Sequence, residues 1–202
     1  GNVFFESSLD NRNIYPGEQF KQAKKVKKAL TSLRTSVSEA LEPVSPFYAV
    51  LMMDGDSLGM HMSDITKHIR ISQALEQFTN AVSGIVDSYS GFLVYAGGDD
   101  VLALLPLEKA LSCALALRQQ YLKAFSGSPD INSTLSGAIE YAHIKMPLGK
   151  VLGDAHQLLD QVAKEEFGRD TIAVRVWKPG GQHLQWARPW EKAITDTKLV
   201  ID

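Results

Sequence analysis

The chain lacks the features that several common protein classes require. Only one of its 202 residues is a cysteine, Cys113, so a disulfide framework is excluded, and its apolar setting, ALSCALAL, predicts a core position. No stretch approaches the roughly 20 unbroken apolar residues of a membrane span. No histidine and cysteine pattern indicates zinc. The net charge of −2 also differs from that of free-standing nucleic-acid-binding domains, which are usually basic.

The start of the chain has equally few recognisable features. GNVFFESSLDNRN has neither the basic segment nor the long apolar core of a signal peptide, and it has no initiator methionine. We therefore expect a piece excised from a longer protein. Because neither a signal peptide nor a membrane span is present, we expect a cytoplasmic location. A hydrophobic fraction of 45% is sufficient for one domain with a substantial core.

Residues 18–42 predict an amphipathic helix. Apolar residues recur at helical spacing, namely Phe20, Ala23, Val26, Leu30, Leu33, Val37 and Leu41. The opposite face is basic, with Lys21, Lys24, Lys25, Lys27, Lys28 and Arg34. This face is either solvated or a docking surface for RNA or an acidic partner. Pro43 and Pro46 end the helix, so residues 1–46 form an N-terminal helical extension and linker.

From residue 47 the pattern becomes regular. FYAVLMM is a continuous apolar run, short enough for a strand buried on both faces. Ser63 is the expected cap of a helix whose apolar stripe comprises Ile65, Ile69, Ser72, Leu75, Phe78, Val82, Ile85 and Tyr89. FLVYA and VLALL flank the tetrapeptide GGDD as a hairpin, and Pro106 begins a second helix. TLSGAIEYAHI and TIAVRVW predict two further strands, with a third helix opened by Pro147 between them.

This order of elements, β-α-β-β-α-β-α-β, predicts an α+β fold. The first six elements match a ferredoxin-like palm, an antiparallel sheet with helices on one face, and an additional helix and strand follow. We assign the palm to residues 47–178 and a C-terminal extension to residues 179–202. In this topology the end of the first strand meets the turn of the hairpin. Asp54 is therefore expected close to Asp99, although 45 residues separate them.

Three carboxylates, those of Asp54, Asp99 and Asp100, are expected to converge at this edge of the sheet. Their mutual repulsion would destabilise the fold unless a cation were bound. Hard oxygen ligands suit Mg²⁺ or Mn²⁺, which also bind substrate phosphates. Two such ions about 4 Å apart can hold the attacking and leaving oxygens of a phosphoryl transfer.

Other residues near this edge are suited to a nucleotide. DGDSLG contributes Gly55, Asp56, Ser57, Leu58 and Gly59, a turn whose backbone N–H groups can bind phosphate. The small residues Gly97 and Gly98 let a nucleotide lie against the hairpin. Lys164 and Arg169 are placed to reach a triphosphate. Three of these features also have a plainer interpretation. DGDSLG can be an ordinary loop with Asx turns, Lys164 can interact with the C-terminal end of a helix dipole, and Arg169 can be a surface residue.

The combination of FYAVLMMDGDSLG, GFLVYAGGDDVLALLP and LLDQVAKEEFGRDTIAV resembles the palm domain of the large subunit of type III CRISPR effector complexes, in particular type III-B. It resembles GGDEF nucleotide cyclases more distantly. FFESSL is similar to the segment that precedes the last palm of that subunit. The resemblance covers residues 45–177 and implies an ATP-dependent nucleotidyltransferase that makes cyclic oligoadenylates in antiviral defence.

The resemblance also implies roles for residues and partners. Asp54 and Asp99 would be the principal metal ligands, with Asp100 and Gly55 beside them, around Mg²⁺ or Mn²⁺. Gly97 and Gly98 would form the nucleotide bed, and Lys164 and Arg169 would bind phosphates. The partners would be ATP and the other subunits of a ribonucleoprotein with guide RNA and target RNA, with no membrane.

Two departures and two alternatives accompany this resemblance. The spacing from Lys164 to Arg169 is one residue longer than the usual GGDEF pattern. The fourth residue of the motif is Asp100 instead of glutamate, and no phenylalanine follows, which argues against a diguanylate cyclase. A diguanylate cyclase stays one alternative. The other is a non-catalytic palm that binds a nucleotide or neighbouring subunits, which the retained aspartates disfavour.

Overall fold

The computed structural model describes residues 9–38, 45–178, 181, 183–195 and 198–199. The chain divides into two compact units, Gly1–Ser45 and Pro46–Asp202. The first contains the predicted helix, α2 (Glu18–Ser38). Most of the FFESSL segment, Leu41 and Pro43 lie outside the described residues, as do the side chains of Leu33, Arg34 and Val37.

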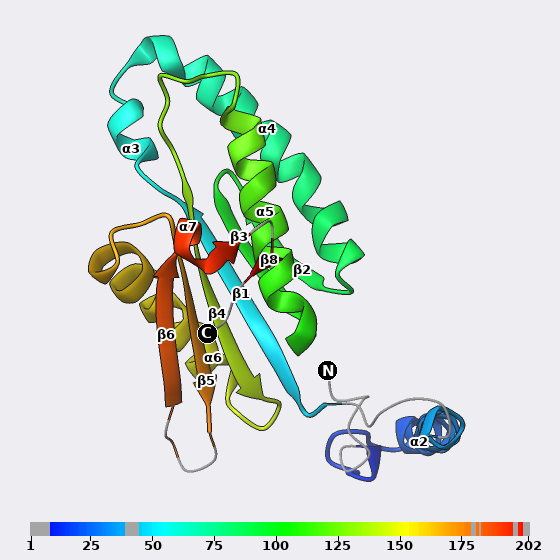
Figure 1. Cartoon of the computed structure of the whole chain (residues 1–202). Coiled ribbons are helices and arrows are strands. Elements are labelled where there is room, and N and C mark those ends of the chain that lie inside the picture. The colour runs from blue at the N-terminus through cyan, green and yellow to red at the C-terminus, as the bar shows by residue number, and fades with distance from the viewer. Residues whose placement is uncertain (1–8, 39–44, 179–180, 182, 196–197, 200–202) are drawn as a thin grey trace. The chain divides into compact units, whose positions relative to one another are not determined.

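A six-stranded sheet forms the centre of the second unit, in the order β2-β3-β1-β4-β5-β6 (Figure 1). The strands are β1 (Phe47–Gly55), β2 (Phe92–Gly97), β3 (Asp100–Leu105), β4 (Leu135–His143), β5 (Thr171–Trp177) and β6 (His183–Pro189). All neighbouring strands are antiparallel except β4 and β5, which are parallel. The arrangement of β2, β3, β1 and β4 is that of a ferredoxin-like unit, as the sequence predicts.

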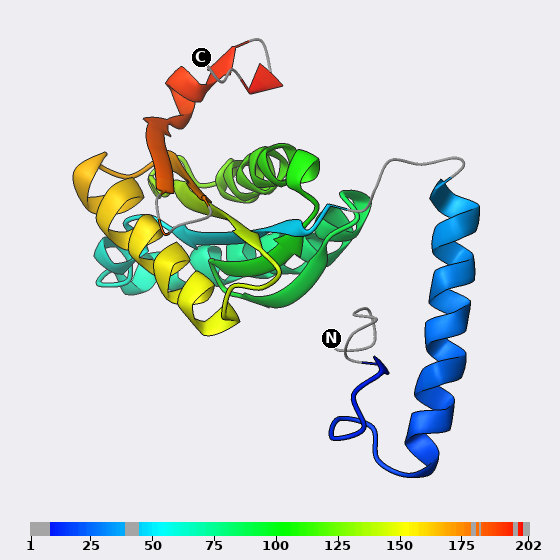
Figure 2. The same cartoon turned by 90° about the horizontal axis from the view of Figure 1, so that it is seen from below.

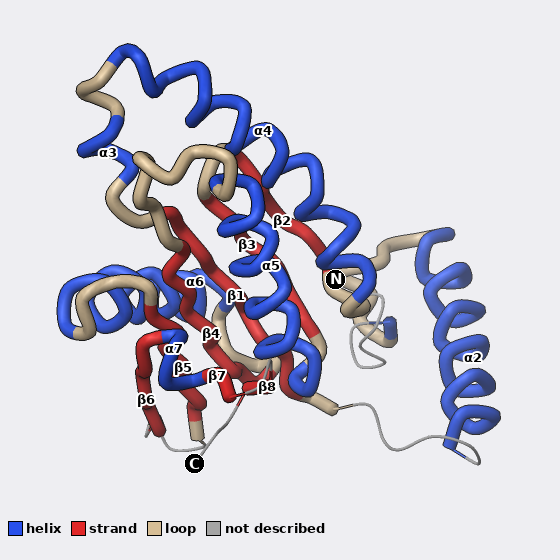
Figure 3. Tube along the Cα trace, turned by 45° about the horizontal axis from the view of Figure 1, so that its top comes forward, coloured by secondary structure: helices blue, strands red, loops and turns tan. Residues whose placement is uncertain are grey.

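Helices α4 (Ile65–Ser88) and α5 (Ala110–Phe125) cover one face of this sheet and run side by side (Figure 3). Short helices precede them, α3 (Leu58–His61) and η2 (Leu107–Lys109). The core between helices and sheet includes Phe78, Cys113, Tyr121, Leu51 and Ile139, all fully buried. Burial raises the pKa of the Cys113 thiol to about 12, so the predicted core position of this cysteine is confirmed.

The third helix lies on the opposite face of the sheet, whereas we expected helices on one face only. Helix α6 (Leu148–Gln157) continues into η3 (Leu158–Glu166), and the two lie across the sheet from α5 (Figure 2). They bury Val50 and Met52 of β1. Since β4 and β5 are parallel, a crossover connection must join them, and it runs over one face of the sheet. This connection covers the second face of β1. The continuous apolar run of β1 thus has a helix on each side.

Helix α4 differs from its prediction at the N-terminus. The cap is Asp64, whose side chain accepts a hydrogen bond from the Thr66 N–H at 3.0 Å, and not Ser63. Ile65 and Ile69 are 77% and 71% exposed, so the stripe predicted from these residues is wrong there. The buried stripe is instead Ile71, Ala74, Phe78, Val82 and Val86. The first turns of α4 extend past the sheet, where no strand can bury their apolar residues (Figure 1).

The residues after β5 pack on the palm. Strand β6 pairs with β5 along its whole length, and it leads into α7 (Trp190–Ala193), β7 (Ile194–Thr195) and β8 (Lys198–Leu199). Trp190 is fully buried and donates its indole N–H to the carbonyl oxygen of Leu135 at 2.9 Å. Of the helices in the described part of the chain, none is long and apolar enough to cross a membrane.

Candidate metal and nucleotide site

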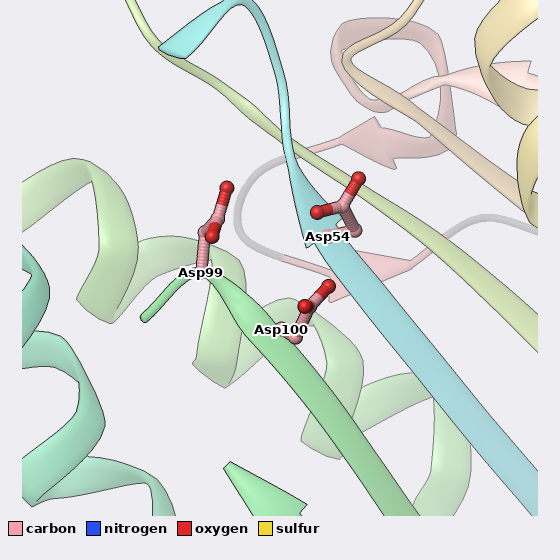
Figure 4. Close-up of side chains that lie close together, drawn as sticks. All are labelled: Asp54, Asp99 and Asp100. Carbon is pink, nitrogen blue, oxygen red and sulfur yellow. The ribbon is translucent and has the colours of Figure 1, made fainter. Parts of the chain in front are cut away.

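Three aspartates meet where β1 ends and the β2–β3 hairpin turns. Asp54 follows the cross-strand pair Met53–Val101, Asp100 begins β3, and Asp99 occupies the turn. One carboxylate oxygen from each lies within 4.8 Å of the others. Figure 4 shows the three side chains around one space. The structure thus brings together the three residues predicted as metal ligands.

The electrostatics of this cluster are unfavourable for three charged carboxylates. Burial raises the pKa of Asp99, and the charges of Asp100 and Asp56 raise it further. A cation among these oxygens would remove that cost. Three carboxylates within this distance fit the oxygen-ligand preference of Mg²⁺ or Mn²⁺.

Lys164 reaches the cluster from the other face of the sheet. Its Nζ forms an ion pair with Oδ2 of Asp54, and its side chain is 15% exposed. Burial lowers the pKa of Lys164 to about 8 and Arg169 adds to this, while the contact with Asp54 acts in the opposite direction. A cation at Asp54 would compete with this ion pair and leave the lysine available for a phosphate.

Gly55 has a direct steric reason to be glycine. A Cβ atom there would lie 2.6 Å from Oδ2 of Asp99 and 2.7 Å from the Tyr121 hydroxyl oxygen. The backbone at the end of β1 therefore passes directly beside the carboxylate of Asp99. This contact keeps Gly55 next to the predicted metal position.

The two glycines of the hairpin have different surroundings. Gly98 adopts a left-handed conformation, φ +64°, with open space where a side chain would be, and its carbonyl oxygen accepts a hydrogen bond from Thr79 Oγ1 at 3.0 Å. At Gly97 the corresponding space is filled, because a Cβ would lie 2.2 Å from the Tyr95 hydroxyl oxygen. Gly97 thus accommodates Tyr95 in this structure, whereas we expected a nucleotide to lie against it.

Asp56 points into the protein. It is 2% exposed, and its carboxylate accepts hydrogen bonds from Thr134 Oγ1 at 2.7 Å, from Ser136 Oγ at 2.9 Å and from the Asp170 N–H at 3.1 Å. Its backbone N–H donates to the Thr134 carbonyl at 2.8 Å. These contacts assign Asp56 to holding the loop after β1, so a direct contact with a nucleotide, which we expected, has no support from the geometry.

The rest of the DGDSLG turn continues past the cluster. Ser57 has a positive φ of 65°, and Leu58 is buried. Gly59 is exposed, and a Cβ added there would meet open space. The letters GDSLG also fit the Gly-x-Ser-x-Gly pattern of serine hydrolases. No histidine within the described residues hydrogen-bonds to the Ser57 hydroxyl, so the serine lacks the base that this chemistry requires.

The helix that carries Lys164 is wound as a π-helix over Leu158–Glu166. A π-helix has one more residue per hydrogen-bonded turn than an α-helix, and such turns occur often at functional sites. It lies over the segment in which the spacing to Arg169 is one residue longer than the GGDEF pattern. Arg169 itself is exposed, with φ +75°, and acts electrostatically on Lys164.

Several residues that support the site were not predicted. Arg118 of α5 binds the carboxylate of Asp170 through Nε at 3.0 Å and Nη2 at 2.9 Å. The Tyr121 hydroxyl pairs with Ser133 Oγ at 2.8 Å, and Ser133 donates to the carbonyl of Asp56 at 2.7 Å. The available signal was the hydroxyl-rich stretch NSTLS, residues 132–136, which leads into the start of β4.

A ferredoxin-like palm that gathers carboxylates at the end of its first strand and at the following hairpin defines the nucleotidyltransferase and cyclase class of palm domains. The model of the family "Cas10/Cmr2, second palm domain" matches residues 47–173, which is more than half of the chain. The chain belongs to this family. The resemblance to the palm of a type III CRISPR large subunit is confirmed.

Two curated relatives agree with this assignment. The CRISPR system Cmr subunit Cmr2 of Pyrococcus furiosus is 34% identical over 196 residues, which cover 83% of this chain and 22% of that protein. The Cmr2 subunit of Saccharolobus solfataricus is 27% identical over 132 residues, 56% of this chain and 12% of that protein. The chain therefore spans less than a quarter of the length of these relatives.

Solved structures show the same fold. The Csm1–Csm4 cassette in complex with cA4 matches with a TM-score of 0.59 and 21% identity, over 72% of this chain and 23% of that chain. The type III-B Cmr-beta complex in its apo state matches with a TM-score of 0.56 and 15% identity, over 72% of this chain and 28% of that chain. At these identities the comparison concerns the fold alone.

Proposed function

We propose that this palm binds ATP with a divalent cation and catalyses nucleotidyl transfer toward cyclic oligoadenylate, within the large subunit of a type III CRISPR effector complex. The observation that carries the proposal is the convergence of Asp54, Asp99 and Asp100 within 4.8 Å, with Lys164 beside them. Two further facts support it: the chain belongs to the Cas10/Cmr2 family, and structural relatives have been captured with cA4 and AMPPNP.

The proposed reaction joins two nucleotides. The 3′-oxygen of one attacks the α-phosphorus of the other, a new P–O bond forms, the bond to the β-phosphate oxygen breaks, and pyrophosphate leaves, while the hydroxyl proton passes to solvent. Mg²⁺ or Mn²⁺, as one ion or as a pair, would supply charge neutralisation and activate the hydroxyl. Asp54, Asp99 and Asp100 would hold the cation, with the backbone at Gly55 beside it.

The remaining residues would orient the triphosphate. Lys164 offers a point charge, and Arg169 can form two parallel hydrogen bonds with phosphate oxygens. The turn from Gly55 to Gly59 would approach the phosphates through its backbone. Other subunits of the complex, guide RNA and target RNA belong to the proposal as partners of the whole large subunit, of which this chain covers a minor part.

Calorimetric titration of the chain with ATP, with and without Mn²⁺, tests this function. We expect ATP binding only with Mn²⁺ and a loss of at least tenfold in affinity for Asp99→Ala. The matched control, Asp87→Ala, removes an exposed aspartate near the end of α4 and should bind as the wild type does.

Equal ATP affinity in EDTA would contradict the metal-dependent site. A clear preference for GTP over ATP would favour the diguanylate cyclase alternative. ATP binding without turnover, in a complete complex that carries this palm, would favour the non-catalytic alternative.

A further inference from the structure

Helix α2 presents a row of lysines that the proposed reaction does not use. Lys21, Lys24, Lys25 and Lys28 are all exposed and follow the i, i+3, i+4, i+7 spacing. At 3.6 residues per turn these positions fall on one face, and their backbone positions span roughly 10 Å along the axis. We call these four residues the lysine stripe.

The charge of the stripe is compensated only in part. Lys21 pairs with Glu18 at 2.7 Å, whereas Lys25 and Lys28 make no ion pair within the described residues. The sequence of α2 contains six basic residues and one acidic residue, a charge of +5, while the whole chain carries −2. The residues outside α2 therefore sum to −7. Positive charge is concentrated on one helix of an otherwise acidic chain.

The other side of α2 is occupied by its own unit. Ala23 is 4% exposed, Lys27 forms an ion pair with Asp10, and the Arg12 guanidinium lies 4.9 Å from the centroid of the Phe20 ring. The segment before α2 thus packs on the side of the helix that carries Ala23 and Lys27, and at the border of the stripe Lys24 Nζ lies 5.1 Å from the centroid of the same Phe20 ring. This leaves the lysines as the face available to a partner.

We propose that the lysine stripe binds the phosphate backbone of a single nucleic-acid strand. Protein interfaces are depleted of lysine and enriched in aromatic residues, and the stripe consists of lysines, with one aromatic ring, that of Phe20, in contact with Lys24. A membrane-binding helix inserts an exposed apolar face, whereas Ala23 on the apolar face of α2 is buried within its own unit. Phosphate groups repeat along a nucleic-acid strand, so a row of lysines of this length can contact more than one of them.

The inference goes beyond the proposed metal and nucleotide site, because it concerns the unit Gly1–Ser45 and needs no metal. Binding of a fluorescent 20-nucleotide single-stranded RNA of mixed sequence to the full chain, in EDTA, tests it. The variant replaces Lys24, Lys25 and Lys28 with glutamine. The matched control replaces the exposed Lys109, Lys123 and Lys145 with glutamine, which changes the net charge equally.

We expect the stripe variant to bind at least tenfold more weakly than the control at 50 mM salt. The slope of log K against log salt should fall by about 2, from about 0.7 for each of three lost phosphate contacts. Single-stranded DNA of the same sequence should bind within a few-fold of RNA, because the contacts are to phosphates. Circular dichroism checks that both variants keep their helices.

Several outcomes would overturn the proposal. Equal losses for the two variants would mean that binding follows net charge and not the stripe. Tighter binding to polyglutamate than to RNA would assign the stripe to an acidic protein, and tighter binding to anionic vesicles would assign it to a membrane. No measurable RNA binding by the wild type at 50 mM salt would leave the stripe as a solvated face.

Discussion

Gly55 is the residue on which the geometry of the acidic cluster depends most closely. The end of β1 and the hairpin turn approach so closely that a Cβ at Gly55 would overlap the side chain of Asp99. Close approach lets carboxylates from two segments, 45 residues apart, bind one ion. It also means that the site tolerates no side chain between its two halves.

Gly55→Ala should therefore impair the site more than the fold. We expect at least a tenfold loss of Mn²⁺-dependent ATP affinity, since Asp99 must move, and a loss of about 1–3 kcal/mol in the free energy of unfolding from overpacking. Gly84→Ala, in α4 with open space around its Cβ, is the control and should be neutral or slightly stabilising. Calorimetry and urea denaturation measure both effects. Unchanged ATP affinity for Gly55→Ala would show that ATP binding does not depend on the position of Asp99.

Among the elements, the strands were the most predictable. Local patterns predict the apolar run of β1, the two arms of the hairpin and the limits of β5. They do so because the apolar residues of each strand are the ones that the sheet buries. The approach of Asp54 to Asp99 followed from topology alone. The predicted convergence of Asp54 and Asp99 thus needed only the order of the elements.

Other features depend on contacts that a local pattern does not contain. The inward orientation of Asp56 requires Thr134, Ser136 and Asp170, which come 78, 80 and 114 residues later in the chain. The exposed start of α4 depends on where the sheet ends. Each of these features is decided by distant segments, so no local pattern predicts it.

The turn between η3 and β5 is held by one arginine of α5. Arg118 binds Asp170 through two nitrogens, and the Asp170 N–H donates to Asp56, so the turn that carries Arg169 is tied to the loop after β1. Arg118→Lys keeps the charge but cannot form the two-point contact. We expect faster amide hydrogen exchange at residues 167–171 and a several-fold weaker ATP affinity.

A matched variant distinguishes this role from a general loss of ion pairs. Arg70 forms a similar two-point contact with Asp130, at 2.6 and 2.8 Å. Arg70→Lys should leave exchange at residues 167–171 unchanged. If both variants changed exchange there equally, the effect would be global and the turn would not depend on Arg118.

At the scale of the whole palm, the two faces of the sheet bury different chemistry. The face under α4 and α5 carries the larger of the two clusters of buried apolar residues. The face under α6 also buries Glu140 and Arg175, which are 0% and 9% exposed. Arg175 donates to Gln185 at 2.7 Å and to the Asp154 carbonyl at 3.2 Å, and its Nη1 lies 3.8 Å from Glu140 Oε2. Within the described residues neither oxygen of Glu140 has a hydrogen-bond partner.

The stability of the palm should therefore decrease with pH because of Glu140. Burial raises the pKa of Glu140 to about 8 from an ordinary 4.5, while Arg175 opposes this shift. Between these two values the folded form keeps a proton that the unfolded form has lost. The free energy of unfolding then falls as pH rises, by at most about 1.4 kcal/mol per pH unit.

Glu140→Gln removes this titration and should flatten the dependence. All three tryptophans, Trp177, Trp186 and Trp190, lie in this unit, so their fluorescence during urea denaturation at pH 5, 6, 7 and 8 in EDTA reports its unfolding. We expect the variant to gain stability relative to the wild type as pH rises, and the exposed control Glu191→Gln to follow the wild type. A difference between Glu140→Gln and the wild type that is the same at pH 5 and pH 8 would show that Glu140 is already charged in the folded palm. The contact with Arg175 would then outweigh the cost of burial, and the second face would be held by an ion pair in place of a neutral carboxyl group.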